Sequence, residues 1–267
     1  KDFILYASYV TFFPQLVAGP VLRAKEVIPQ FKARVPFSWV WIAEGARRII
    51  FGLFLKVVIA DNIAPLVETG FAIPLETIGA IDVWTLAFLF GFQIYFDFSA
   101  YSHIALGSAK LMGISFPANF NFPYSSSSPK EFWRRWHISL SSWIRDYLYL
   151  PLSGATFKDR SVGGLEGAAS PTEKKWPLFV SWSIMGLWHG ANWTFVVWGL
   201  LHGLGLSLEM VFGKQRKKLA KAIPTWLFNA IALAVTFSFV NFTYIFSLFH
   251  HHQAEETQLL WVSVALV

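Results

Sequence analysis

The chain has 267 residues, of which 55% are hydrophobic and only 14% are charged, and 27 are Phe and 13 are Trp. Its 22 basic and 16 acidic side chains supply too little polar surface for a soluble core of this length, so the composition indicates a polytopic protein of the lipid bilayer. The net charge of +6 lies in short Lys/Arg clusters that orient membrane spans, with no motif for nucleic-acid binding, and the lack of Cys excludes disulfides and thiolate chemistry in these residues.

We interpret residues 1–267 as a single membrane domain, and we expect it to be truncated at both ends. It begins at Lys1 with neither an initiator Met nor a basic and apolar leader. It ends inside the apolar run 259–267, which is too short to span a bilayer. The Gly, Ala and Ser residues of 163–170 indicate a plain linker.

The first two apolar stretches are interrupted. Residues 3–21 contain Pro14, which predicts a bent or re-entrant segment. Residues 39–60 carry charged side chains, so this stretch is either an interfacial amphipathic helix or a span whose charges face protein, and we favour the span. The charged residues are Glu44, Arg47, Arg48 and Lys56.

Three longer apolar stretches follow. Residues 81–112 would form a helix longer than a bilayer core of about 30 Å, so that helix must tilt, kink or emerge. Residues 178–211 are also too long for one straight helix, while residues 226–249 predict a clean span. Three residues near the middle of 178–211 favour a break there: Gly186, Gly190 and Asn192.

The segment 128–151 carries the clearest helix signals. Ser128 can cap the first turn, Pro129 suits its first position, and Glu131 is placed to complete a capping box. At about 100° per residue, seven apolar side chains share one stripe: Phe132, Trp133, Trp136, Leu140, Trp143, Ile144 and Tyr147. We predict one amphipathic helix along the membrane interface, with its tryptophans at headgroup level and His137 at the edge of the stripe.

His189 lies inside the apolar stretch 178–211, where an ionisable side chain is costly and typical of a functional site. Acyl transfer to an alcohol needs a base that removes the hydroxyl proton, and imidazole suits that role near neutral pH. A neutral imidazole also lets the site stay dry. The alternative for His189 is a hydrogen bond to a neighbouring helix, and for His137 it is an interfacial side chain with a wet tip.

Polar residues near these histidines are candidates for substrate contacts, and we assign Asn192, Asp97 and Trp188 to this role. Asp97 shares a helix face with Gln93 and Tyr101, where it either lines a tunnel or pairs with a cation such as Arg47 or Arg48; we favour the pair. Asn192 lies on the side of His189 only if the helix continues between them. It can then orient the imidazole or donate to an oxyanion, and otherwise it is structural.

Two further histidine positions carry less information. Gly199 and Gly203 form a small-xxx-small pattern that favours close helix packing, and His202 between them is left unassigned. The three histidines of 250–252 have no other residue at ligand spacing, so we interpret them as an exposed loop and not as a metal site.

Four sequence blocks stand out in chain order: Phe-Phe-Pro-Gln-Leu-Val-Ala-Gly-Pro at 12–20, Tyr-Phe-Asp-Phe-Ser-Ala-Tyr-Ser at 95–102, Trp-Arg-Arg-Trp-His-Ile-Ser-Leu-Ser-Ser-Trp-Ile-Arg-Asp-Tyr-Leu-Tyr-Leu-Pro-Leu at 133–152 and Leu-Trp-His-Gly-Ala-Asn-Trp at 187–193. Together they resemble the membrane-bound O-acyltransferase (MBOAT) family, most closely its bacterial alginate O-acetyltransferase branch. The resemblance implies an all-α bundle of tilted helices around a transmembrane tunnel. It also implies that His189 is the catalytic histidine and His137 the second family histidine.

The chain departs from the family pattern at two places. Related sequences usually have Asp at the position of His103, and Phe-Phe-Arg where this chain has Ser-Leu-Phe-His-His-His at 247–252. Any role of these residues is therefore left open.

The resulting prediction is a multi-pass O-acyltransferase of the bacterial cytoplasmic (inner) membrane. It would move an acetyl or other short acyl group from a cytoplasmic thioester donor, acetyl-coenzyme A or an acyl carrier protein, toward hydroxyls of a cell-envelope or extracellular polysaccharide such as alginate, with His189 as general base. The resemblance also implies a periplasmic or extracellular acetyltransferase partner. We expect no bound cofactor and no metal. Two alternatives are D-alanyl transfer to teichoic acid and a transporter or channel, although the internal symmetry typical of transporters is not visible.

Overall fold

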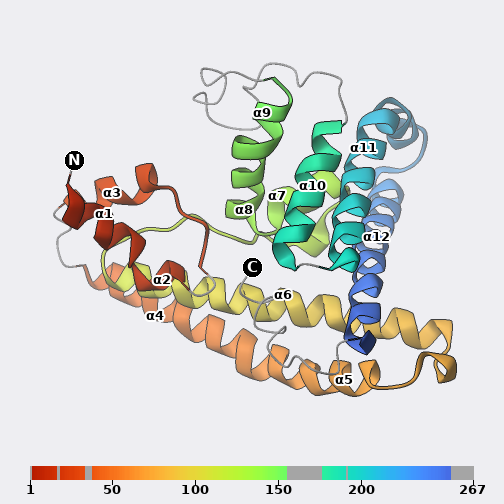
Figure 1. Cartoon of the computed structure of the whole chain (residues 1–267), viewed down its shortest axis with the longest axis horizontal. Helices are drawn as coiled ribbons and strands as arrows, with labels where there is room; N and C mark the ends of the chain where they lie inside the picture. The colour runs from red at the N-terminus through yellow and green to blue at the C-terminus, as the bar shows by residue number, and fades with distance from the viewer. Residues whose placement is uncertain (1, 17–18, 34–37, 155–175, 191, 254–267) are drawn as a thin grey trace. The chain divides into compact units, whose positions relative to one another are not determined.

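The computed structural model describes residues 2–16, 19–33, 38–154, 176–190 and 192–253 (Figure 1). These residues form helices and no strand, which confirms the predicted all-α class. They fall into two compact units. Unit 1 comprises the described residues up to Asn121 together with His137–Ser139, and unit 2 comprises Phe122–Trp136 and the described residues from Leu140 onward. The linker at 163–170 and the apolar run 259–267 lie outside the described residues.

Unit 1 is built on one pair of long helices. Its elements are α1 (Phe3–Val10), α2 (Phe13–Leu16), α3 (Ala24–Lys32), α4 (Trp39–Leu53), the π-helix η1 (Phe54–Ala60), α5 (Asp61–Phe71), the 3₁₀ helix η2 (Leu75–Thr77) and α6 (Ala80–Leu111). α4, η1 and α5 form one continuous helix that packs along α6 (Figure 1). Glycines allow this approach, since a Cβ atom at Gly52 would lie 2.7 Å from the carbonyl oxygen of Ala100. The segment 3–21 begins as two short helices, α1 and α2, in agreement with the predicted bend.

Unit 2 is a cluster of helices around α11. Its elements are the 3₁₀ helix η3 (Pro123–Ser125), α7 (Pro129–Arg135), the π-helix η4 (Arg145–Tyr149), α9 (Leu150–Leu152), α10 (Trp176–His189), α11 (Trp193–Ala222) and α12 (Thr225–Gln253), and α8 (Ile138–Ile144) begins in unit 1 and continues here. α11 contacts α7, α10 and α12, and the three long helices lie side by side (Figure 1).

Four of the described helices are long and apolar enough to cross a membrane: Trp39–Phe71, Ala80–Leu111, Trp193–Ala222 and Thr225–Phe246. The favoured interpretation of residues 39–60 as part of a span agrees with this finding by length and composition. The predicted break within 178–211 is confirmed, because α10 ends at His189 and α11 begins at Trp193. The predicted loop at 250–252 was wrong, since the backbone stays helical to Gln253.

The prediction of one continuous helix over 128–151 was also wrong. The chain leaves the helical conformation at Trp136 and His137, where His137 has a φ of 39°, and the later turns include the π-helical segment η4. Periodicity misled here because most apolar side chains of the stripe are buried in the protein, whereas Trp143 and Tyr147 are exposed. Trp133 and Trp136 are only 6% and 7% exposed, so protein side chains surround these two rings.

Candidate functional site

His189 is the last residue of α10, at the break before α11. Asn192 ends this break as the N-cap of α11, and its side-chain oxygen Oδ1 accepts a hydrogen bond of 3.0 Å from the backbone N–H of Thr194. The helix therefore does not continue from His189 to Asn192, which removes the condition under which the two side chains were predicted to share a helix face. In the described structure Asn192 acts as a helix cap.

The His189 imidazole lies among aromatic rings. Its ring centroid is 5.0 Å from that of Trp198 at an interplanar angle of 78°, and 5.6 Å from that of Trp188 at 61°. The ring nitrogen Nε2 is buried and has no hydrogen-bond partner among the residues that the structure describes. The desolvation of such a polar atom is not compensated by a protein group, so Nε2 is a candidate position for a hydrogen bond to a ligand.

Glycines set the distance between α10 and α11 and thereby bring Trp198 to His189. A Cβ atom at Gly186 would collide with the carbonyl oxygen of Phe195, and one at Gly199 would collide with that of Trp182. This close approach confirms the packing interpretation of the small-residue pattern. It also means that the aromatic surroundings of His189 depend on two backbone contacts.

His202 is fully buried in unit 2 and joins three helices. Its Nδ1 accepts a hydrogen bond of 3.2 Å from the indole Nε1–H of Trp133 in α7, and its Nε2 lies 3.1 Å from Oγ1 of Thr243 in α12. The Thr243 hydroxyl donates its hydrogen to the carbonyl oxygen of Val240 at 2.7 Å, so its oxygen accepts the hydrogen bond from Nε2–H of His202. Both ring nitrogens of His202 are thus used in structural hydrogen bonds.

His137 is only 3% exposed and belongs to unit 1, and this burial does not fit the alternative of an interfacial side chain with a wet tip. Its Nδ1 lies 3.1 Å from Oδ1 of Asn119. The same oxygen accepts hydrogen bonds from the backbone N–H of Ser139 at 3.2 Å and from its hydroxyl at 2.8 Å, which identifies it as the amide oxygen. Because that oxygen only accepts, the Nδ1 atom carries the proton, and the lone pair of the neutral ring lies on Nε2.

The backbone of His137 is held in an uncommon conformation. A φ of 39° lies in the left-handed region, which residues other than Gly adopt rarely and chiefly where the surrounding structure enforces it. Here the next N–H, of Ile138, donates to the carbonyl oxygen of Asn119 at 2.9 Å, and the ring packs edge-on against Phe98 with centroids 4.7 Å apart. The imidazole is therefore fixed in both tautomer and orientation.

Asp97 forms an ion pair, but with a different cation than we expected. Its Oδ1 lies 2.8 Å from Nζ of Lys56, which also lies 2.8 Å from Oδ1 of Asp61. The Lys56 ammonium group is 5.7 Å from the ring centroid of Tyr101, so the predicted polar face of α6 is confirmed at these positions. Arg47 and Arg48 are exposed instead. The structure supports the predicted ion pair and identifies Lys56 as its cation.

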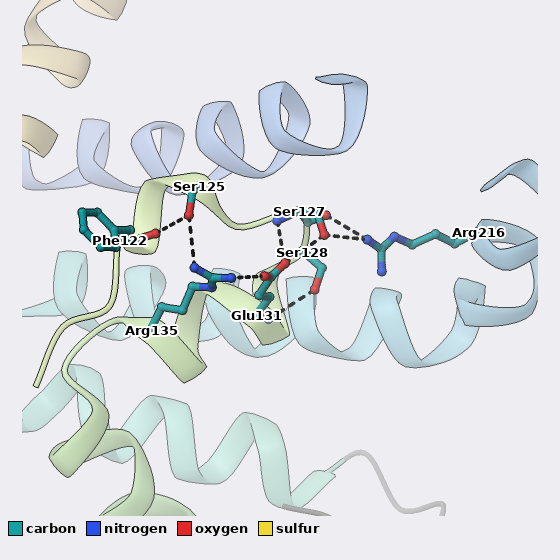
Figure 2. A network of polar contacts seen from close by, with 7 residues as sticks. All are labelled: Phe122, Ser125, Ser127, Ser128, Glu131, Arg135 and Arg216. Atoms are coloured by element: carbon teal, nitrogen blue, oxygen red, sulfur yellow. Dashed lines mark hydrogen bonds and ion pairs between the residues drawn. The ribbon is translucent and has the colours of Figure 1, made fainter. Parts of the chain in front are cut away.

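A polar network at the start of α7 fixes this helix in unit 2 (Figure 2). The Ser128 hydroxyl caps the helix by accepting from the N–H of Glu131 at 3.2 Å, and Pro129 occupies the first helical position as predicted. The Glu131 carboxylate departs from the predicted capping box, because Oε2 accepts from the N–H and hydroxyl of Ser127 at 2.8 and 2.9 Å. Its Oε1 pairs with Arg135 at 2.8 Å. Burial raises the pKa of Glu131, but these bonds and the Arg135 charge outweigh it and lower the pKa below its ordinary value.

The model of the MBOAT, membrane-bound O-acyltransferase family matches residues 2–249, which is nearly the whole chain. The chain belongs to this family. It is thereby an all-α membrane protein, as its composition and helices had indicated.

Three bacterial proteins are similar to this chain in sequence. A peptidoglycan O-acetyltransferase of Helicobacter pylori is 39% identical over 248 residues, which cover 92% of this chain and 44% of the relative. A probable alginate O-acetylase of Pseudomonas aeruginosa is 40% identical over 97% of this chain and 45% of the relative. A teichoic acid D-alanyltransferase of Bacillus subtilis is 32% identical over 91% of this chain and 62% of the relative. The chain spans less than half the length of the two O-acetylating relatives.

The candidate residues of this MBOAT chain fall in both units. His189, Trp188 and Asn192 lie together at the break between α10 and α11 in unit 2, with Trp188 half-exposed beside the imidazole. His137 and Asp97 belong to unit 1. In the described part of the chain, no group of three or more His, Asp or Glu side chains could hold a metal ion. The roles of these residues in binding or chemistry remain predictions.

Sequence reasoning missed Asn119 and Lys56. Asn119 lies in the loop after α6, where no periodicity indicates its direction, and its importance depends on a contact with a residue 18 positions away. Lys56 was noted as a charge in an apolar stretch, but the π-helical turn η1 changes the face on which it lies. The helical period alone gave no signal for either partner.

Proposed function

We propose that this protein is a membrane-bound O-acyltransferase that moves an acetyl or other short acyl group from a cytoplasmic thioester toward hydroxyls of a cell-envelope polysaccharide. The observation that carries the proposal is the buried, unpartnered Nε2 of His189 among the rings of Trp188 and Trp198. Membership in the MBOAT family and relatives named for O-acetylation of peptidoglycan and alginate support the reaction class. For the location we propose the bacterial inner membrane.

In the proposed reaction His189 acts as the general base. An acceptor hydroxyl donates to Nε2, its oxygen attacks the thioester carbonyl carbon, and its proton passes to the imidazole. The tetrahedral intermediate then expels the thiolate, which takes the proton from the imidazolium, so the products are an ester and a free thiol. The hydroxyl would supply the hydrogen-bond partner that Nε2 otherwise lacks.

The position of His189 favours a water-poor reaction centre. The 14 residues of α10 correspond to about 21 Å of helix, less than a hydrocarbon core of about 30 Å. We propose that α10 starts at one membrane face, and a helix of this length would then end inside the hydrocarbon. Exclusion of water there would protect the activated acyl group from hydrolysis.

We assign supporting roles to the other candidates. We propose His137, whose Nδ1–H donates to Asn119, as a second catalytic histidine in addition to His189. Trp188 and Asn192 are proposed to contact substrate beside His189. We also propose that Asp97 contacts substrate, although its ion pair with Lys56 supports a structural role. The proposed acyl donor is acetyl-coenzyme A or an acyl carrier protein, with an acetyltransferase on the far side as partner and the polysaccharide as final acceptor.

The decisive test replaces His189 by Gln and measures transfer of labelled acetyl groups in membranes that contain the protein. We expect a loss of about 10²- to 10⁴-fold, the usual contribution of a general base. His103→Gln is the matched control and should retain activity, because it removes a half-buried histidine that the proposed reaction does not use. Retained acylation in His189→Gln, with both variants folded, would make His189 structural.

A second candidate function is D-alanyl transfer to teichoic acid, favoured by the similarity to the Bacillus subtilis D-alanyltransferase. It uses the same chemistry with a different acyl group. Membranes supplied in parallel with labelled acetyl-coenzyme A and labelled D-alanyl carrier protein would separate the two functions. Label on the wall polymer from the D-alanyl donor alone would reject acetyl transfer.

A further inference from the structure

Four lysines occupy the last turns of α11, and we call their common surface the lysine face: Lys214, Lys217, Lys218 and Lys221. At about 100° per residue their side chains fall within an arc of roughly 100°, so they lie on one side of the helix. All four are exposed, and within the described ranges none of them forms an ion pair. The helix therefore presents four uncompensated positive charges in a single direction.

Arg216 lies in the same turns but points away from the lysine face, into unit 2. Figure 2 shows its guanidinium group reaching Ser127, where Nη2 donates to the carbonyl oxygen at 3.0 Å and to the hydroxyl oxygen at 3.2 Å. Its Nη1 is 3.7 Å from Oε1 of Glu209. This cation is satisfied within the protein, and its contacts fix the rotation of α11 so that the lysines face outward.

The surroundings of the lysine face change from apolar to basic along the helix. Met210 and Val211 lie one turn before Lys214 on the same side, and both are exposed within a helix that is apolar enough to span a membrane. After the lysines the chain turns into α12, where Trp226 is 73% exposed. Lys side chains that follow an apolar turn at the end of one helix, with an exposed Trp at the start of the next helix, are expected where two successive helices meet the headgroup layer.

We propose that the lysine face binds the phosphate groups of anionic phospholipids. Lipid is the occupant that fits, because the lysines directly continue a lipid-facing apolar surface and four ammonium groups on one arc complement a layer of phosphates. In a lipid layer, acyl chains would cover the adjoining Met210 and Val211 while phosphates meet the lysines, so one kind of occupant accounts for both parts of this surface. The inference rests on charge and placement alone and does not depend on the acyl-transfer proposal.

The test titrates the detergent-solubilised protein with phosphatidylglycerol, with phosphatidylcholine as the neutral reference, and counts bound lipids by native mass spectrometry. A variant with all four lysines changed to Gln should lose about tenfold or more in apparent affinity for phosphatidylglycerol and show no change for phosphatidylcholine. The matched control changes the same four residues to Arg, which keeps the charge and should keep the affinity within about twofold.

Unchanged phosphatidylglycerol binding in the Gln variant would overturn the proposal. The proposal would also fail if the Gln variant still bound phosphatidylglycerol but no longer bound an acyl carrier protein or acetyl-coenzyme A. The lysine face would then be a docking surface for the acyl donor. Should the Gln variant fail to fold, the wild-type protein still decides the question. Its phosphatidylglycerol binding must weaken steeply in about 0.5 M NaCl, where the Debye length is only a few ångströms, and salt-insensitive binding would refute the lysine face as the site.

Discussion

The Nδ1 atom of His137 lies 3.1 Å from the Oδ1 atom of Asn119, so a loop residue 18 positions earlier determines which nitrogen of this histidine can act as a base. The same oxygen holds both the N–H and the hydroxyl of Ser139. One amide group thus stabilises the left-handed turn at His137 and orients its ring.

Replacing Asn119 by Leu should lower the free energy of unfolding by about 2–4 kcal/mol, because it leaves the His137 Nδ1–H and the Ser139 N–H buried without an acceptor. Asn119→Asp keeps the acceptor oxygen and is the conservative control. Its negative charge favours the imidazolium form, so the acid limb of a pH–rate profile should move to higher pH. Thermal unfolding in detergent and acyl transfer against pH measure the two effects. An unshifted profile in Asn119→Asp would remove His137 from the reaction.

The sequence was sufficient for what depends on composition and on local breaks. Apolar length indicated the membrane class, and Gly190 with Asn192 indicated the end of α10 next to His189. The failures come from packing that periodicity does not encode. The stripe around Trp133 suggested an interfacial helix because a buried apolar face and a lipid-facing one have the same pattern, and the break at His137 depends on distant hydrogen bonds from Asn119.

A methyl group at Gly199 should push α10 and α11 apart, because its Cβ atom would collide with the carbonyl oxygen of Trp182. We expect Gly199→Ala to lower the free energy of unfolding by about 1–3 kcal/mol, the usual cost of overpacking, and to reduce acylation by displacing Trp198 from His189. Gly213→Ala in the same helix is the matched control, since a Cβ there has no atom within 4 Å. It should stabilise the helix by about 0.5–1 kcal/mol, and equal losses in both variants would contradict the packing argument.

The pKa of Glu131 is lowered in the folded protein from its ordinary value of 4.5. A carboxyl group with a depressed pKa contributes stability that is present above the ordinary value and disappears as the pH falls through the folded value. Glu131→Gln should therefore unfold at a lower temperature than the wild type at pH 7, and the difference should shrink below pH 4.5. Melting curves of the wild type and of Glu131→Gln, recorded from pH 7 to below pH 4.5, test the direction of this change. A difference that grows on acidification would contradict the assigned ion pair with Arg135.

Lys56 pairs with both Asp61 and Asp97. Loss of the shared cation should therefore cost more stability than loss of one carboxylate. Lys56→Met leaves two carboxylates uncompensated within a membrane helix pair and should lower the free energy of unfolding by roughly 2–4 kcal/mol. Asp97→Asn leaves the Lys56–Asp61 pair in place and keeps a polar side chain, so we expect a loss of about 1 kcal/mol. Denaturant titration in detergent ranks the variants. The reverse order would mean that Lys56 is solvated rather than held by the cluster.

His202 lies 4.7 Å from Trp198 by ring centroids, and Trp198 in turn contacts His189, yet the two histidines should respond differently to mutation. His202→Leu removes the acceptor of the Trp133 indole N–H and the donor to Thr243, so it should destabilise the protein by about 2–4 kcal/mol. Thr243→Val removes one of these bonds and should cost about half as much. Acyl transfer per folded molecule, measured after correction for the folded fraction, should fall no more than about tenfold in either variant, against the 10²- to 10⁴-fold loss expected for His189→Gln. A loss of acyl transfer in His202→Leu as large as that in His189→Gln, with the fold intact, would contradict this expectation. It would mean that His202 takes part in proton transfer in addition to joining α7, α11 and α12.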